Sequence, residues 1–276
     1  MTRYLLRTLA LVYLLFLLIL PVGLIGWRTV QHGLSPVLHA LTTPDAVHAF
    51  EVTASVAIWT VIANTLFGVG TATLLVRHRF PGKRILSALI DLPLAVSPVV
   101  VGLALILVYG SFAPVGGWLE HHGFQVIFSL PGMVLATIFV SLPLVVRAIV
   151  PVLEELGFDQ EQAAHTLGAG RLQTFWRITV PGIRAALGYG VVLCLARALG
   201  EYGAVAVVSG RLVGQTQTAT LFVEERYNNF DQTSAFATAT VLALVAVATL
   251  LLTRLMRSRE ATPVEPTSVT VLKENA

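Results

Sequence analysis

The chain has 276 residues, of which 55% are hydrophobic and only 12% are charged, and its mean hydropathy is +0.79. Soluble domains carry about a quarter charged residues, so this composition excludes an ordinary soluble protein and indicates an integral membrane protein. The net charge of +3 does not indicate a nucleic-acid partner, because the basic residues follow a membrane-topology pattern. The single cysteine, Cys194, cannot form an intrachain disulfide. The adjacent His121 and His122 point apart on a helix or strand, so no metal site is predicted.

Six segments contain the roughly 20 apolar residues that a membrane-spanning helix needs. They cover Leu9–Trp27, Val52–Val76, Ile85–Tyr109, Val126–Val150, Leu187–Val208 and Ala235–Met256. The first follows Arg3 and Arg7, as in a signal peptide, but it lacks a small-residue cleavage site and is therefore interpreted as an anchor. The predicted fold is an all-α integral membrane domain of six spans over residues 1–258. Residues 259–276 lack an apolar pattern and are predicted to form a disordered tail.

The distribution of Lys and Arg predicts how these spans are oriented. Most of the 18 basic residues fall in the N-terminal segment, the connection between the second and third spans, the loop after the fourth span and the tail. Only Arg28, Arg211 and Arg226 fall in the other connections, and Arg147 and Arg197 lie within spans. Because cytoplasmic connections of membrane proteins are enriched in Lys and Arg, both termini and the loop after the fourth span are predicted to be cytoplasmic.

Prolines interrupt two of the predicted spans. Pro93 and Pro98 lie in the third span, and Pro143 lies in the fourth. Proline removes a backbone donor and bends or breaks a helix, and a broken backbone at membrane depth is tolerated where it lies against protein or lines a water-filled cavity. The two prolines of DLPLAVSPVVVG favour the wall of a transport pathway over an ordinary kink. Ser97 is then a candidate lining hydroxyl, and the alternative is a serine bonded to its own helix.

A polar, amphipathic stretch separates the fourth and fifth spans, and we refer to it as the 153–186 loop. Asp159 is a suitable N-cap, and Gln162 follows three residues later, as in a capping box. Gly168 suits the C-terminal cap. These signals predict a short helix from Gln160 to Leu167.

A second helix is predicted over Arg171–Ile178, and Pro181–Gly182 is expected to end it before the fifth span. Its apolar stripe has the i, i+3, i+4, i+7 spacing of one helix face and consists of Leu172, Phe175, Trp176 and Thr179. Such a pair of helices suits either a groove on a soluble partner or the lipid surface, and the residues alone leave both interpretations open.

The 153–186 loop resembles the EAA motif of ABC importer permeases, in which E-A-A, three residues and Gly are followed by an aliphatic residue and Leu-Pro. The motif maps onto Gln162, Ala163, Ala164, Gly168, Ile178, Val180 and Pro181. The loop departs from the motif at Gln162, where the family has Glu, and at Val180, where it has Leu. Glu161 falls in the first turn of the predicted helix, where a negative charge suits the helix dipole, and lies one position before the motif register.

Four further segments extend the resemblance to the sulfate/thiosulfate branch of these permeases. They are IDLPLAVSPVVVGL (Ile90–Leu103), FSLPGMVLATIFVSLPLVVR (Phe128–Arg147), QTFWRITVP (Gln173–Pro181) and ARALGEYGAVAVVSG (Ala196–Gly210). The last, with GQTQTATLFVEERYN after it, is most similar to the W-type (CysW-like) subunit, and the similarity covers roughly residues 45–255. The resemblance implies the type I ABC importer (MetI-like) permease fold with a cytoplasmic EAA coupling loop.

The resemblance also implies a transport machine in the bacterial inner membrane. This chain would form half of the pore beside a T-type (CysT-like) permease or a second copy of itself, and a periplasmic sulfate/thiosulfate-binding protein would deliver the anion. A CysA-like ATPase dimer, which binds ATP and Mg, would contact the loop at Gln162, Ala163, Ala164, Gly168, Phe175 and Pro181. The chain lacks the G-x-x-x-x-G-K-[ST] motif of phosphate-binding loops, so we expect no enzymatic activity and no cofactor of its own.

Ionisable residues also lie within the predicted spans. Arg197 and Glu201 are four residues apart in the fifth span. Because intramembrane charges pair or serve a pathway, they form either a structural pair beside tight helix contacts, which we favour, or part of the pathway. Asp91 is predicted either to snorkel to the membrane surface or to cap a helix that begins at Pro93.

Three other functions are alternatives. The same machine could carry a related oxyanion such as molybdate or tungstate. A stand-alone channel or secondary carrier would need no cytoplasmic docking loop. A membrane-embedded enzyme would need clustered ionisable groups, whereas the spans offer only the Arg197–Glu201 pair and Asp91 as candidates.

Overall fold

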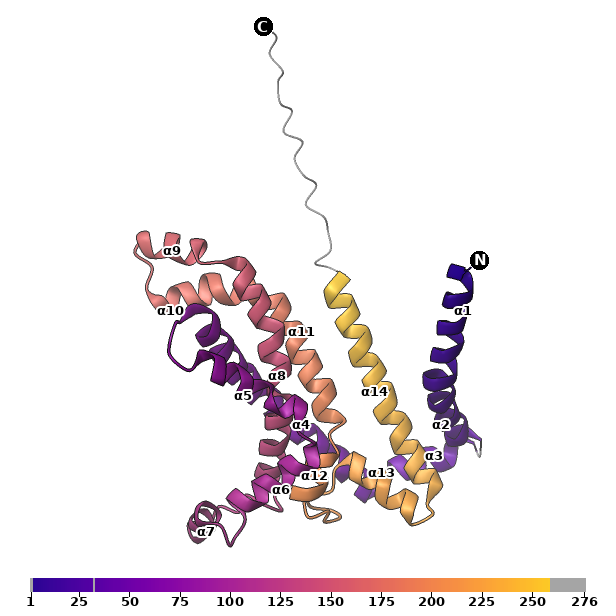
Figure 1. The fold of residues 1–276 in the computed structure, drawn as a ribbon. Coiled ribbons are helices and arrows are strands. Elements are labelled where there is room, and N and C mark those ends of the chain that lie inside the picture. The colour runs from indigo at the N-terminus through magenta and orange to yellow at the C-terminus, as the bar shows by residue number, and fades with distance from the viewer. Residues whose placement is uncertain (1, 32, 259–276) are drawn as a thin grey trace.

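The computed structural model describes residues 2–31 and 33–258, and the predicted tail of residues 259–276 lies outside them. Every secondary-structure element of the described residues is a helix (Figure 1). The two elements labelled η are short π-helices. In chain order the elements are α1 (Thr2–Leu14), η1 (Leu15–Ile19), α2 (Leu20–Val30), α3 (Leu34–Leu41), α4 (Pro44–Arg77), α5 (Lys83–Ala95), α6 (Pro98–Tyr109), α7 (Pro114–His121), α8 (Leu130–Leu156), α9 (Asp159–Thr166), α10 (Arg171–Thr174), η2 (Phe175–Thr179), α11 (Val180–Leu199), α12 (Gly203–Val208), α13 (Ala219–Asn228) and α14 (Gln232–Ser258).

Five stretches are long and apolar enough to cross a membrane, and a sixth is bent. The five are Tyr4–Val30, Pro44–Arg77, Leu130–Leu156, Arg171–Leu199 and Gln232–Thr253. Helices α5 and α6 qualify only as a pair, because the chain bends by 114° between them. The predicted number of six spans holds when this bent pair is counted as one.

The second span, α4, is long enough to project from a membrane. Thr43 is its N-cap, with Oγ1 accepting a hydrogen bond from the Ala46 N–H at 3.4 Å, and Pro44 occupies the first helical turn, where its missing N–H costs nothing. Its 34 residues correspond to about 51 Å of helix, against a hydrocarbon thickness of about 30 Å. The end that carries Arg77 therefore reaches the 153–186 loop.

Helices α4, α8 and α11 form the centre of the molecule and approach one another at Val145, which is fully buried. A Cβ atom on Gly68 of α4 would lie 2.7 Å from the Val145 Cγ1, and one on Gly190 of α11 would lie 3.2 Å from the Val145 Cα. Small residues let membrane helices approach closely, so both contacts depend on glycine. The buried apolar cluster around Val145 continues to Leu153 and Ile183, which lie near the two ends of the 153–186 loop.

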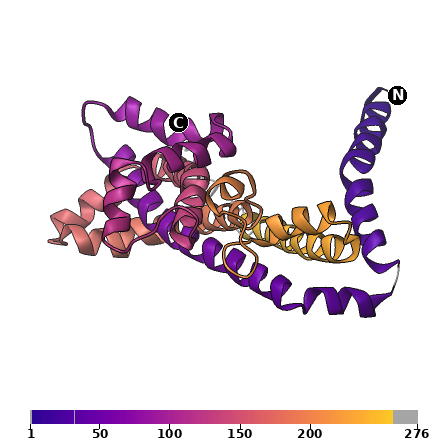
Figure 2. The ribbon, with the colours of Figure 1, turned by 90° about the horizontal axis from the view of Figure 1, so that it is seen from below.

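The remaining helices surround this centre. On α6, a Cβ at Gly102 would lie 2.8 Å from the Val207 Cβ and 2.9 Å from the Ala204 carbonyl oxygen, so α6 and α12 are in close contact. Helix α14 packs against α11 and α13, and α2 packs against α14, where the Thr29 hydroxyl donates to the Phe236 carbonyl at 3.0 Å. Helix α1 extends away from the other helices (Figures 1 and 2).

Prolines break the helices at fewer places than predicted. Pro143 lies inside α8 and Pro93 lies inside α5, so the predictions that Pro143 interrupts the fourth span and that Pro93 begins a helix are wrong. Both prolines are buried, and packing against neighbouring helices holds a membrane helix together where one hydrogen bond is lost. The break falls at Ser97, the residue before Pro98, which adopts the extended backbone that a following proline favours.

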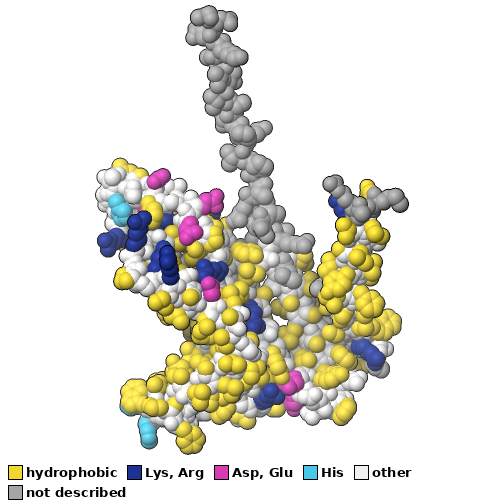
Figure 3. All heavy atoms as spheres, in the orientation of Figure 1, with side chains coloured by type: hydrophobic (Ala, Val, Ile, Leu, Met, Phe, Trp, Pro, Cys, Tyr) yellow, Lys and Arg dark blue, Asp and Glu magenta, His cyan; other side chains and the backbone are white. Residues whose placement is uncertain are grey.

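The basic residues gather at one end of the molecule. The start of α1, the end of α4, the α9–α10 region and the end of α14 lie at this end, whereas α3, α7 and α13 lie at the opposite end (Figure 1). Lys and Arg side chains concentrate around α9, α10 and the start of α5, and hydrophobic side chains cover much of the remaining visible surface (Figure 3). The segments grouped by their charge in the sequence therefore share one end of the fold.

Candidate functional site

Helix α9 is the short helix predicted in the 153–186 loop, but its start differs from the prediction. It begins at Asp159, and Phe158 rather than Asp159 occupies the N-cap position. Its end is the predicted glycine cap. Gly168 has a φ angle of +86°, and its N–H and that of the next residue donate to the carbonyls of His165 and Ala164, both at 3.0 Å. This pair of bonds is a Schellman motif, which favours glycine at the left-handed position.

The second helix of the loop does not stop at Pro181, so the predicted stop is wrong. Helices α10, η2 and α11 are continuous from Arg171 to Leu199. In an α-helix the proline ring would clash with the carbonyl four residues earlier. Here the wide π turn Phe175–Thr179 precedes it, with the Val180 N–H bonded to a carbonyl five residues back. The fifth span therefore begins inside the loop and ends before the predicted Leu187–Val208 does.

The π turn also divides the predicted apolar stripe. Phe175 is half-buried and packs against the apolar cluster around Val145, and Thr179 is buried. In contrast, Leu172 and Trp176 are 72% and 62% exposed, and Leu167 at the end of α9 is 88% exposed. We call Leu167, Leu172 and Trp176 the apolar patch of the loop.

Most of the residues that match the EAA motif lie on the outer surface of the loop. Gln162, Ala163, Gly168 and Pro181 are exposed, whereas Ala164 and Phe175 are half-buried. A cavity of about 340 Å³ lies between the loop and the end of α4, and Arg77, Glu161, Gln162, His165, Arg171 and Thr179 are among its lining residues. We call the exposed surface of Gln162, Ala163, Gly168 and Pro181 the outer face of the loop, and the side that borders this cavity and adjoins α4 its inner face. Gln162 belongs to both, because it is exposed and also lines the cavity.

A largely buried ion pair joins the inner face of the loop to α4, and sequence reasoning missed it. The Arg77 Nε lies 3.1 Å from the Glu161 Oε2, and the two side chains are only 8% and 18% exposed. The Thr179 hydroxyl donates to the Glu161 Oε1 at 2.8 Å. Arg77 also donates to the Leu153 carbonyl at 3.1 Å and lies 4.6 Å from the Phe158 ring centre. Arg77 and Glu161 are 84 residues apart, so no local spacing rule reveals the pair.

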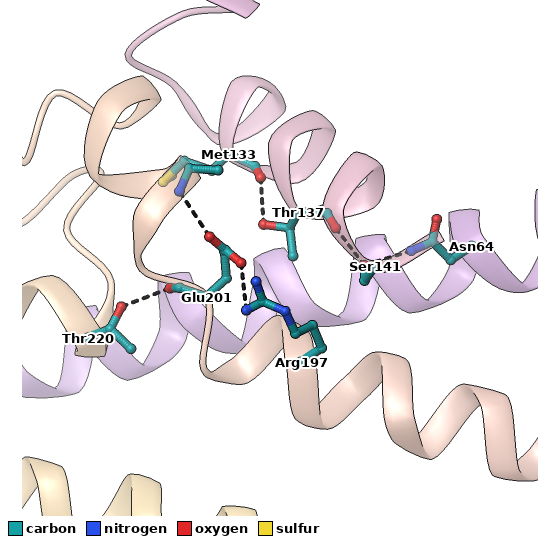
Figure 4. A network of polar contacts seen from close by, with 8 residues as sticks. Asn64, Met133, Thr137, Ser141, Arg197, Glu201 and Thr220 are labelled. Carbon is teal, nitrogen blue, oxygen red and sulfur yellow. Dashed lines mark hydrogen bonds and ion pairs between the residues drawn. The ribbon is translucent and has the colours of Figure 1, made fainter. Parts of the chain in front are cut away.

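A second ion pair lies where α11 ends (Figure 4). The Arg197 Nη1 lies 2.8 Å from the Glu201 Oε2, and the two side chains are 37% and 1% exposed. Glu201 lies beyond the end of α11 rather than on the same helix as predicted. Its Oε1 accepts from the Ala204 N–H at 2.9 Å, and its carbonyl accepts from the Thr220 hydroxyl at 3.0 Å. The buried carboxylate therefore links the end of α11 to the start of α12 and holds the partly exposed Arg197 guanidinium in place.

The break between α5 and α6 lies near this α11–α12 junction. Ser97 is exposed at the α5–α6 break, and its side chain makes no capping hydrogen bond with any residue of the described chain. A Cβ on Gly203, at the start of α12, would lie 3.0 Å from the Pro98 Cβ. The α5–α6 break and the α11–α12 break are therefore in contact.

Asp91 does not cap a helix that begins at Pro93, because both residues lie inside α5. It accepts a hydrogen bond from the Arg147 Nε at 2.7 Å and a second, shorter one from Nη2, which also donates to the Ser87 hydroxyl at 3.0 Å. This bidentate pair links α5 to α8 and is half-exposed. Such planar, two-point pairing is the strong form of an Arg–carboxylate contact.

A buried polar chain connects the three central helices, and Figure 4 shows its part on α8 and α4. The Thr137 hydroxyl donates to the Met133 carbonyl at 2.8 Å, and the Ser141 hydroxyl donates to the Thr137 carbonyl at 2.5 Å. The Asn64 side-chain amide of α4 donates to the Ser141 hydroxyl at 2.8 Å and to the Cys194 sulfur of α11 at 3.4 Å. These bonds fix α4, α8 and α11 relative to one another.

Known proteins resemble the chain in both sequence and fold. Residues 64–260 match the family model described as the binding-protein-dependent transport system inner membrane component. The sulfate transport system permease protein CysW of Synechocystis sp. is 47% identical over 93% of both chains. The CysW protein of Escherichia coli K12 is 46% identical over 88% of this chain and 84% of its own. A chain in the crystal structure of a bacterial alginate ABC transporter superposes over 95% of both chains with a TM-score of 0.76 at 17% identity.

These matches confirm the predicted fold, an all-helical ABC importer permease of the MetI-like type. They also place the chain among non-catalytic permease subunits that pass through the inner membrane several times. The chain belongs to the family of binding-protein-dependent transport system inner membrane components, within its CysW-like branch.

Proposed function

We propose that this chain is one of the two pore-forming subunits of an ATP-driven importer of sulfate or thiosulfate. The observation that carries the proposal is its 47% identity, over 93% of both chains, to a protein named as a sulfate transport permease. The other half of the pore is a T-type (CysT-like) permease or a second copy of this chain. A periplasmic sulfate/thiosulfate-binding protein delivers the anion to the pore.

A separate ATPase dimer, of the CysA-like type, binds ATP and Mg and supplies the energy. The absence of a phosphate-binding-loop motif from this sequence supports that division. The ATPase contacts the outer face of the 153–186 loop, where Gln162, Ala163, Gly168 and Pro181 are exposed. The apolar patch anchors this contact, because exposed aromatic and aliphatic side chains on a helix suit a hydrophobic groove.

Both termini and the 153–186 loop face the cytoplasm in this proposal. The bias of Lys and Arg toward these segments supports the orientation, as does the position of the start of α1, the end of α14 and the α9–α10 region at one end of the fold (Figures 1 and 3). The ATPase contact then lies in the compartment that contains ATP.

The anion passes the level where the α5–α6 and α11–α12 breaks meet, with Ser97 and Arg197 in the pathway wall and the buried Glu201 carboxylate paired with Arg197 behind it. The Arg197 guanidinium is partly exposed, and a buried carboxylate already offsets its charge. A pathway must release its ion as well as attract it. A guanidinium that is paired with a carboxylate still offers free N–H donors to an anion, but it holds the anion less tightly than an unpaired one.

Uptake by the reconstituted complex tests the cargo and the energy source. Proteoliposomes holding the permease pair and the ATPase should accumulate labelled sulfate only with ATP and the sulfate-loaded binding protein. Accumulation without ATP would indicate a secondary carrier and contradict the proposal. Molybdate or tungstate uptake in place of sulfate would assign a related oxyanion as cargo.

Substitution of Gly168 tests the role of the loop. Gly168→Val should abolish sulfate uptake, because a β-branched residue cannot adopt a φ angle of +86° and the end of α9 would be displaced. Gly170→Val is the matched control, because Gly170 has a φ angle of −71° and no atom of the described chain within 4 Å of a built Cβ. Full uptake by a well-expressed Gly168→Val complex would contradict the coupling role of the loop.

A further inference from the structure

The EAA motif places a glutamate at the position of Gln162, and here that position is neutral and exposed. The negative charge lies one residue earlier, on Glu161, and points inward. Both residues border the cavity between the loop and α4, but Gln162 is exposed, whereas the Glu161 carboxylate is largely buried and bonded to Arg77 and Thr179. Glu161 is therefore bonded within the chain and does not point toward the ATPase surface.

The contacts of this one carboxylate link its own helix to two other helical elements. Glu161 belongs to α9, and its Oε1 accepts from Thr179 of η2, which continues into α11. Its other oxygen lies 3.1 Å from the Arg77 Nε at the end of α4. Arg77 adds a fourth element, because it donates to the Leu153 carbonyl near the end of α8. The central helices α4, α8 and α11 are thus all joined to α9 through the Arg77–Glu161 pair.

The low exposure of the pair makes these contacts strong and costly to break. Charge-assisted hydrogen bonds are about twice as strong as neutral ones, and removing one partner of a buried pair leaves an uncompensated charge. The Phe158 ring, 4.6 Å from the guanidinium carbon, shields the pair on one further side. Loss of the Glu161 charge would therefore free α9 to move without the central helices.

We propose that Glu161 is a positioning residue that makes α9 and the central helices move as one body, so that a displacement of α9 by the ATPase reaches the pore. The proposal rests on the proposed function of the 153–186 loop as the ATPase contact. It assigns this charge-dependent role to Glu161 in place of the residue at the motif position.

The test compares Glu161→Gln with Glu155→Gln in the complete complex. Glu155 lies in the same loop and is exposed, and its side chain makes no ion pair or hydrogen bond within the described residues. For Glu161→Gln we expect normal assembly and basal ATP hydrolysis, with stimulation by the sulfate-loaded binding protein reduced about tenfold, the equivalent of about 1.4 kcal/mol. Glu155→Gln should behave as the wild type. Wild-type stimulation in an assembled Glu161→Gln complex would overturn the proposal.

A second pair of variants decides the outcome if Glu161→Gln fails to assemble. Thr179→Val removes the hydroxyl bonded to Glu161 while leaving both charges in place, and Thr179→Ser keeps the hydroxyl. We expect Thr179→Val to lower the stimulated ATPase rate about threefold and Thr179→Ser to restore it. Equal stimulated rates in these two variants would also overturn the proposal.

A distance measurement separates this proposal from the identity of the cargo. Spin labels at Gln160→Cys on α9 and Arg79→Cys beyond α4, both exposed sites, report the α9–α4 distance with and without trapped ATP. The distance distribution should stay narrow and unchanged in wild type and broaden in Glu161→Gln. If wild-type complexes accumulate no sulfate but show this behaviour, the proposed cargo fails while the positioning role stands. A narrow distribution in Glu161→Gln contradicts the positioning role alone.

Discussion

The contact between α4 and α8 can be tested by adding one methyl group at Gly68. An added Cβ would lie 2.7 Å from the Cγ1 and 3.0 Å from the Cβ of Val145, closer than real side chains approach. Val145 is fully buried, and a β-branched side chain in a helix has one strongly preferred rotamer, so it cannot turn aside. Overpacking of this kind costs about 1–3 kcal/mol.

Gly70 provides the matched control on the same helix. It is exposed, and a built Cβ meets no atom of the described residues within 4 Å. Both Gly→Ala changes gain about 0.8–1.0 kcal/mol of helix propensity, so their difference isolates the overpacking. Thermal unfolding of the purified complex in detergent should place Gly68→Ala several degrees below Gly70→Ala, since about 1 kcal/mol shifts Tm by about 2–4 °C in chains of this size. Equal midpoints would refute the packing argument.

Two further predictions concern buried polar groups. Arg197→Met leaves the buried Glu201 carboxylate without its cation and should lower the unfolding free energy by about 3–5 kcal/mol. Arg184→Met, at an exposed arginine of the same helix, should change it by less than about 0.5 kcal/mol, and equal effects on Tm would contradict the assigned pairing. Thr53→Val removes the hydroxyl that accepts from the Ala219 N–H at 2.8 Å and should cost about 1–2 kcal/mol. Hydrogen exchange should then increase first at the start of α13, and unchanged protection there would count against the contact.

The features that depend on a few neighbouring residues could be predicted from the sequence. The end of α9 followed from Gly168, because a Schellman cap needs a left-handed residue and glycine adopts that conformation without strain. The break in the third span followed from Pro98, since the residue before a proline disfavours the helical region. The long apolar segments of the sequence predicted the number of candidate spans, although not all of their bounds, because hydrocarbon excludes unpaired backbone groups and demands long apolar helices.

Features that depend on distant contacts could not be predicted. Pro181 normally ends a helix, but the wide turn before it removes the clash, and that turn leaves no simple sequence pattern. The Arg77–Glu161 pair joins residues 84 apart, so it follows only from the packing of α4 beside the loop. Pro143 stays inside α8 for the same reason, because its neighbours hold the helix where the hydrogen bond is missing.

The continuity of α10, η2 and α11 has a mechanical consequence. The 29 residues of Arg171–Leu199 form a rod of about 43 Å, so a tilt of about 10° displaces one end by about 7 Å relative to the other. The helical hydrogen bonding continues along this rod through the π turn Phe175–Thr179, so a push on the end that carries Arg171 is transmitted along it. The first joint is at Gly200, where the rod ends and α12 turns away. A displacement of the Arg171 end would therefore be passed along the helix to the turn at Gly200, and the Arg197–Glu201 pair spans that turn.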